Sequence, residues 1–311
     1  MKSNLRHFLA KFSFTNKSLL AFQTKKLKKR QRVLSEKLAE ELKIEFFGVK
    51  ALKALVKTKY NENKPEICHI IGSGWSLNQS IKSISENDFV IGFNQSAISG
   101  VKSDLYFVEF GSVTESDITE KQFKLVQEVI KPHTEHIFFK NLWAMRNDYS
   151  VVKNTWNTSV KYVNDIPVNC YNAKFLSQSL DVFLEEDPVF VRQYSSTALT
   201  LVKLAKDLDF KKIVLHGIDF GGEYFFDTEN FDDYLDLKKY LPNRTGQKIY
   251  NKASSKSTHI TSKDLFGLKY ALPLVRERFV EKGVTLYAAT EISPLSKVLP
   301  VYPEYLKSTH E

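Results

Sequence analysis

The sequence predicts an α/β fold, a three-layer Rossmann-like sheet of mostly parallel strands, with a basic helical extension at the N-terminus. Two observations indicate the sheet: short β-branched runs alternate with longer helical patterns, and a glycine turn follows the first run. One observation indicates the extension: the first 60 residues hold 16 of the 45 Lys and Arg residues but only four acids. The basic character of the chain therefore belongs to the extension, and the remainder is slightly acidic.

The predicted strands are six apolar runs rich in β-branched or aromatic residues. They span residues 67–71, 88–93, 104–110, 136–139, 211–217 and 284–289. Helices are predicted between them over residues 117–130, 195–208 and 262–281. Because strands and helices alternate, the strands are expected to run parallel, with any ligand at their carboxyl ends.

The extension is predicted to be an amphipathic helix over residues 17–57, a stretch with no proline and with Gly48 as its one glycine. The block at residues 25–32 (KKLKKRQR) makes it strongly positive. Three roles stay open: a solvated arm that packs on the body or on a second subunit, attachment to an anionic membrane surface, and nucleic-acid binding. The last is disfavoured, because no aromatic residues are interleaved with the basic ones.

The polar segment NENKPE is predicted to link an arm, residues 1–60, to a body, residues 61–311. No run of about 18 apolar residues exists to span a membrane, and Lys11 interrupts any secretory signal, so a cytoplasmic protein is expected. With 42% hydrophobic residues, wholesale disorder is excluded. The two cysteines cannot form a disulfide framework, and no metal site is predicted.

Polar and glycine residues follow three of the predicted strands. The turn GSGWSL at residues 72–77 follows the first, and its glycines allow a ligand to approach the backbone closely. Asn94 and Gln95 follow the second, and their amides can read a base or a ribose. The segment GIDF at residues 217–220 follows the fifth, with Tyr224 shortly after it.

These motifs, taken in order, resemble those of the bacterial sialyltransferases of glycosyltransferase family 42, the lipooligosaccharide enzymes of Campylobacter and Haemophilus. The family pattern is G-N-G-P-S-L after a strand, N-Q after the next, R-x-x-S at a helix start, G-I-D-F with Y-x-F-D-T, and H-x4-D. The corresponding residues here are 72–77, 94–95, 192–195, 217–220, 224–228 and 259–264. The match covers roughly residues 66–300 and leaves the extension out; its most specific part is GIDF with YxFDT.

The resemblance implies a GT-A-variant fold and an inverting, metal-independent transfer of sialic acid from a CMP-sugar to a hydroxyl of a glycan such as lipooligosaccharide. The CMP-sugar is a substrate, so no cofactor is implied. In the catalytic roles, His259 would be the general base on the acceptor, Tyr224 would donate to the departing phosphate, and Arg192 would orient the donor or acceptor. The implied nucleotide and donor contacts are Gly72, Ser73, Gly74, Ser76, Asn94, Gln95, Ser195, Ser196, Gly217 and Asp219. Of these, Asp219 is expected to order a loop or the ribose.

Three departures from the family pattern bear on the donor sugar. Gly221 stands where the family has a second tyrosine, Ser73 replaces an asparagine, and Glu109 falls near a family asparagine that contacts the sugar. The donor therefore stays open between sialic acid and another CMP-activated ulosonic acid such as Kdo. Two other classes also stay open. One is a hydroxymethylpterin diphosphokinase-like or Maf-like enzyme, which shares the G-x-G-x-S-L turn, and the other is a non-catalytic nucleotide-binding or membrane-associated relative.

The expected partners follow from these features. They are a CMP-sugar donor, a glycan acceptor, an anionic membrane surface through residues 1–60, and further copies of the chain, since the family forms oligomers. Nucleic acid is not among them. A protein bound peripherally at the inner face of the inner membrane would fit this set.

Overall fold

The computed structural model describes the greater part of the predicted body and some of the extension. The described residues are 18–22, 45–60, 63–109, 124–132, 136–140, 197–220, 224–225 and 268–308, with short pieces within residues 25–40 and 161–191 and the single residue 134. Within this described part, no helix is both long and apolar enough to cross a membrane.

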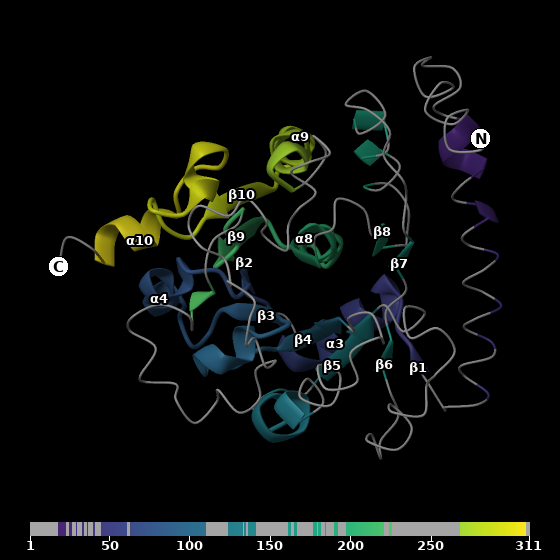
Figure 1. The fold of residues 1–311 in the computed structure, drawn as a ribbon, viewed down its shortest axis with the longest axis horizontal. Coiled ribbons are helices and arrows are strands. Elements are labelled where there is room, and N and C mark those ends of the chain that lie inside the picture. The colour runs from purple at the N-terminus through teal and green to yellow at the C-terminus, as the bar shows by residue number, and fades with distance from the viewer. Residues whose placement is uncertain are drawn as a thin grey trace, which may run out of the picture.

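An eight-stranded sheet forms the centre of the structure (Figure 1). Its strand order is β1-β6-β5-β4-β3-β2-β9-β10, and each of these neighbouring pairs is parallel. The strands are β1 (Glu45–Phe46), β2 (Ile67–Ile71), β3 (Phe89–Phe93), β4 (Leu105–Glu109), β5 (His136–Lys140), β6 (Lys161–Tyr162), β9 (Lys212–His216) and β10 (Thr285–Ala288). A separate parallel pair is formed by β7 (Asp165–Ile166) and β8 (Phe190–Val191). The predicted α/β class and all six predicted strands are confirmed.

The apolar side chains of the strands alternate between two faces of the sheet. One face carries Cys68 and Ile70, and the residues in register with them, such as Ile213 and Leu215, belong to the same large buried cluster. The helices α8 (Thr197–Asp207) and α9 (Leu268–Val280) add many side chains to this cluster and lie on one side of the sheet in Figure 1. They confirm the predicted helices in these regions.

Shorter helical segments accompany the other parts of the sheet. They are α4 (Leu77–Ser80), α10 (Pro303–Ser308), the 3-10 turns η1 (Ile81–Ser83), η2 (Ser96–Ser99) and η8 (Pro294–Lys297), and η3 (Val126–Ile130), a turn of π-helix. In Figure 1, α4 and η3 lie on the side of the sheet away from α8 and α9. The sheet therefore has helical cover on both faces, as a three-layer arrangement requires.

Residues 45–60, the last part of the predicted arm, belong to the body. Residues 45–46 form β1, which pairs with β6 at the edge of the sheet, so the expectation of one continuous helix over residues 17–57 is wrong. After Gly48 the chain enters α3 (Val49–Tyr60), whose Leu52 and Val56 lie in the main core. The hydrophobic periodicity of residues 49–57 reports this packing against the core.

Polar contacts also fasten α3 to the sheet. The Tyr60 hydroxyl donates to Asp104 Oδ1 at 2.5 Å, and the Lys59 ammonium lies 2.8 Å from the same oxygen. The other carboxylate oxygen of Asp104 accepts the backbone N–H of Val90 at 2.7 Å. The predicted boundary at residue 60 therefore falls inside one packed unit.

We expect Leu52→Ala to lower the free energy of unfolding by about 2–5 kcal/mol, because it removes a fully buried side chain from the main core. Lys57→Ala, at an exposed position of the same helix, is the matched control and should change it by less than about 0.5 kcal/mol. Chemical denaturation followed by circular dichroism measures both. Equal stability of the two variants would show that α3 is a separable arm after all.

Candidate functional site

Three neighbouring strands end at one edge of the sheet, and the predicted motifs follow them there. Ile71 of β2 is in register with Gly92 of β3 on one side and with His216 of β9 on the other. The strand order reverses at this place, since β3 to β6 extend to one side of β2 whereas β9 and β10 lie on the other. Ligands of open α/β sheets bind in the crevice beside such a reversal.

The glycine turn after β2 is hydrogen-bonded to the segment after β9. The Gly72 N–H donates to the carbonyl of His216 at 2.8 Å, and the Gly74 N–H donates to the carbonyl of Gly217 at 2.7 Å. The Leu77 N–H then donates back to the carbonyl of Gly74, which begins α4. Two motifs about 140 residues apart in the sequence are thus one structural unit.

The glycines of the turn are required by this close contact. A Cβ atom at Gly72 would lie 2.5 Å from the carbonyl oxygen of Gly217, and one at Gly74 would lie 2.5 Å from Oδ2 of Asp219. Gly217 has a φ of 55°, a conformation that glycine adopts without strain. The sequence pattern suggested room for a ligand; the structure shows that the chain itself occupies the space beside both glycines.

Asp219 holds these segments together. Its Oδ2 accepts the Ser76 N–H at 2.9 Å, and its Oδ1 accepts the hydroxyls of Ser76 at 2.8 Å and Ser293 at 2.7 Å. The carboxyl group is almost fully buried, and burial raises its pKa above the usual range although the three hydrogen bonds act in the opposite direction. The carboxylate therefore connects the segment after β9 with the turn after β2 and with Ser293, and a contact with the ribose stays a prediction.

Tyr224 lies against the same turn, although 150 residues separate it from Gly74. The two residues form an isolated antiparallel bridge, and the N–H of Phe225 donates to the carbonyl of Ser73 at 3.1 Å. The Asn78 side-chain amide donates to the carbonyl of Phe225 at 3.1 Å. The tyrosine of the YxFDT motif is therefore held beside the glycine turn by backbone and side-chain hydrogen bonds.

Asn94 follows β3 at the same edge. Its φ of 55° lies in the left-handed region, where asparagine is tolerated better than most residues. The buried Tyr106 hydroxyl fixes this turn, because it donates to the carbonyl of Asn94 at 2.6 Å and accepts the N–H of Ala97 at 2.9 Å. The side-chain oxygen of Asn94 is buried and finds no hydrogen-bond partner among the residues that the structure describes. A buried amide oxygen of this kind is suited to accept from a bound molecule. Gln95, next to it, is partly exposed.

Several predicted site residues lie outside the described residues: Arg192, Ser195, Ser196, Gly221 and His259. Their roles stay predictions. Glu109 is the last residue of β4, two strands from β2 in the sheet. Within the described part of the chain, no group of three or more His, Cys, Asp and Glu side chains is placed to hold a metal ion.

Sequence reasoning missed two buried histidines at this edge, His69 in β2 and His216 at the end of β9. Both are fully buried, and their ring nitrogens lie 2.8 Å apart. The signal was present in the runs ICHII and KIVLH, since a histidine inside an otherwise apolar strand needs a polar partner.

No protein-family model and no curated protein matches the chain. Among solved structures, the Campylobacter jejuni sialyltransferase CstII with the substrate analogue CMP-3FNeuAc is 19% identical, with a TM-score of 0.45 over 76% of this chain and 87% of that one. The monofunctional α-2,3-sialyltransferase Cst-I of the same organism is 18% identical, with a TM-score of 0.44 over 77% and 81%. CstII with a trisaccharide acceptor and CMP is 19% identical, with a TM-score of 0.42 over 77% and 87%. These are enzymes of the kind that the motifs resemble, but similarity at this level does not by itself assign an activity.

Asp219→Asn and Asp219→Ala should differ sharply if this residue orders the loops. Alanine leaves three donors without an acceptor, so we expect the free energy of unfolding to fall by about 3 kcal/mol. Asparagine keeps the shape and one accepting oxygen, so its loss should be less than half of that. Denaturation curves measure both, and equally large losses of turnover in two equally stable variants would instead indicate a chemical role for the carboxylate.

Proposed function

We propose that this protein is a glycosyltransferase that moves sialic acid, or a related ulosonic acid, from a CMP-sugar to a hydroxyl of a cell-surface glycan such as lipooligosaccharide. The transfer inverts the anomeric centre and needs no metal ion. The proposal rests on the collinear motifs of the sequence and on the site at the carboxyl ends of β3, β2 and β9.

The position of Tyr224 is the observation that carries the proposal. The YxFDT motif is separated from the glycine turn by most of the body, yet Tyr224 pairs with Gly74 in a backbone bridge. A phosphate group held by the turn would therefore have a tyrosine hydroxyl within the same loop cluster. The parts of one donor site must meet, and the parallel pairing of β2 with β9 brings these two motifs to the same end of the sheet.

The residues present fit the chemistry of CMP departure. When the bond to the sugar breaks, the sugar becomes oxocarbenium-like and negative charge grows on the phosphate. Hydroxyl and N–H donors stabilise that charge where no metal ion takes part. Tyr224, Ser195 and Ser196 have this role in the proposal, and His259 takes the proton of the acceptor hydroxyl. Asn94, with its unpaired buried oxygen, accepts a hydrogen bond from the nucleotide.

Ligand-dependent thermal stability tests the proposed donor class. CMP should raise the melting temperature of the protein, because a ligand that binds only the folded state stabilises that state. ATP and UDP at equal concentration should not raise it. In the same protein, His259→Ala should keep the CMP-induced shift but lose at least about 100-fold in sugar transfer, the usual contribution of a general base. His133→Ala is the matched histidine variant, since no motif includes it.

The outcomes separate the competing functions. Stabilisation by ATP alone would favour the diphosphokinase-like class, and CMP binding without hydrolysis of any CMP-sugar would favour a non-catalytic relative. Full transfer activity in His259→Ala would remove this residue from the role of base. A panel of CMP-activated sugars, assayed for release of CMP, identifies the donor.

The basic segment before β1 is proposed to hold the protein at the inner, anionic face of a membrane. Lys25, Lys26 and Lys29 are exposed, and Phe22 and Val33 are each 60% exposed, which suits an interfacial helix. Replacing the three lysines with glutamate should weaken binding to phosphatidylglycerol vesicles at least about tenfold, since each basic residue contributes roughly 1 kcal/mol. Lys50→Glu, on α3, is the control. Equal sedimentation of both variants with vesicles would contradict the proposal.

A further inference from the structure

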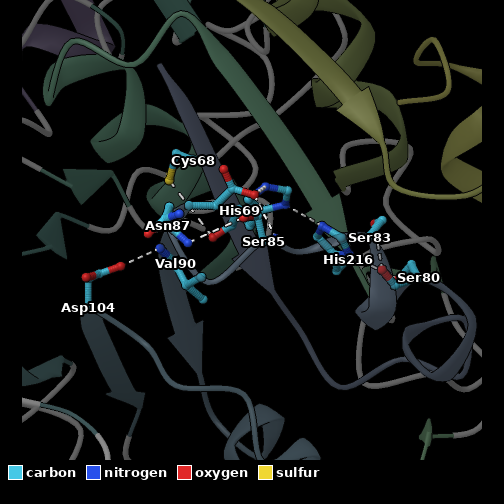
Figure 2. A network of polar contacts seen from close by, with 10 residues as sticks. Cys68, His69, Ser80, Ser83, Ser85, Asn87, Val90, Asp104 and His216 are labelled. Carbon is cyan, nitrogen blue, oxygen red and sulfur yellow. Dashed lines mark hydrogen bonds and ion pairs between the residues drawn. The ribbon is translucent and has the colours of Figure 1, made fainter. Parts of the chain in front are cut away.

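A chain of buried polar side chains lies on the face of the sheet opposite the main core. Asp88 Oδ2 is 3.1 Å from His69 Nε2, His69 Nδ1 is 2.8 Å from His216 Nε2, and His216 Nδ1 is 3.1 Å from the Ser80 hydroxyl. His69, His216 and Ser80 are completely buried, and Asp88 is 17% exposed at the outer end. Figure 2 shows the two imidazole rings side by side, with Ser80 at the far end.

The inner end of this chain reaches the glycine turn of the candidate donor site. The Ser80 hydroxyl lies 3.2 Å from the carbonyl of Leu77 and 3.4 Å from that of Ser76. The carbonyl of His216 accepts the Gly72 N–H at 2.8 Å. His216 therefore holds the turn at both ends, through its backbone at Gly72 and through its ring at Ser80.

The hydrogen bonds of the chain can be satisfied in two ways. Without an extra proton, Ser80 donates to His216, His216 donates to His69, and His69 donates to Asp88. With one extra proton, His69 is an imidazolium that donates to both Asp88 and His216, His216 donates from Nδ1 to Ser80, and Ser80 donates to the carbonyl of Leu77. The extra proton comes from solvent, and in both states every contact between neighbouring members of this hydrogen-bond chain has one donor and one acceptor.

A second proton would break the chain. With both rings charged, two N–H groups would face each other across 2.8 Å. Burial, and then the neighbouring His69, hold the pKa of His216 well below the usual range, which opposes this proton. The ring of Tyr302 packs edge-on against His69 at 5.8 Å, and Tyr302 in turn faces Tyr287 and Glu304. Asp88 and Ser80 contact the two rings at the outer and inner ends.

We propose that His69 and His216 are positioning residues for the donor site, which hold the turn of residues 72–80 through a hydrogen-bond chain that survives one protonation and fails at the second. The inference rests on the proposed function for its substrate. According to this proposal, side chains on the face of the sheet opposite the main core help to fix the backbone that binds the donor. Asp88 accepts a hydrogen bond from His69 Nε2 at the outer end.

The pH dependence has a definite sign. Because the folded protein takes up a proton at His216 less readily than the unfolded chain, its contribution to stability is complete above about pH 6.5 and is lost as the pH falls below that value. CMP affinity should follow the same course. We expect a nearly constant dissociation constant between about pH 8 and 6.5 and a weakening of at least about tenfold at lower pH, where the turn is released.

The experiment compares wild type, His69→Gln, His216→Gln and His136→Gln by calorimetry with CMP at several pH values. His136, on β5, is not part of the hydrogen-bond chain from Asp88 to Ser80 and serves as the control. Both chain variants should weaken CMP binding about tenfold at pH 7.5 and flatten the pH profile, whereas the control should match wild type. Wild-type pH profiles in the two chain variants would overturn the proposal.

A second measurement needs no nucleotide. Trp75 lies in the turn itself, so its fluorescence in a Trp143→Phe/Trp156→Phe background reports the state of the turn. In histidine-labelled protein, ¹⁵N NMR should show that His216 exchanges its Nε2 proton for an Nδ1 proton when the hydrogen-bonded pair of histidines takes up one proton, a change that no merely structural role requires. A fixed His216 tautomer, or Trp75 emission that does not change on acidification, would overturn the inference. If CMP does not bind but the tautomer exchange and the Trp75 change are both observed, the proposed substrate is overturned and the positioning role stays in place.

Discussion

The carboxylate of Asp219 is the interaction on which the candidate site depends. Three donors, from the loops of Ser76 and Ser293, converge on this carboxylate. Neither these two loops nor the loop of Asp219 is part of a long helix or strand that could fix its position independently. Burial of a carboxylate is unfavourable unless hydrogen bonds compensate it, so the loops and the charge stabilise each other. The glycine turn, the start of α4 and the segment after β9 take their relative positions from this group. Tyr224 reaches the site by pairing with a turn that is already held in this way.

Much of the sheet could be predicted because its central strands are buried on both faces and read as continuous apolar runs. The two short strands β1 and β6 could not. Residues 45–46 and 161–162 are too short to carry a periodic pattern, and they are strands because neighbouring strands offer them hydrogen bonds. The helical periodicity of α3 was visible, but periodicity alone does not say which surface an apolar face covers. It covers the main core, and this moves residues 45–60 into the body.

The site was predictable to the extent that parallel strands bring their carboxyl ends together. That rule alone brings the segments after β2, β3 and β9 to one edge, and the structure has them there. It could not give the reason for the glycines, because their neighbours are atoms of Gly217 and Asp219, far away in the sequence. It also could not reveal the pair of His69 and His216, since each histidine taken singly is only an unusual residue in an apolar run. Their meaning depends on a diagonal contact across two strands.

The pairing of β2 with β9 sets the order in which the molecule can assemble. Strands β2, β3, β4 and β5 are neighbours in the sheet in the same order as in the chain, so this half can form from contacts close in sequence. β2 gains its other neighbour only when residues 212–216 arrive, some 145 positions after Ile67. Contacts of such separation form late and slowly in folding. The candidate donor site lies at the junction of β2 and β9. A molecule that contacted both the glycine turn and the segment after β9 would therefore also stabilise the contact between the early-forming and late-forming halves of the fold.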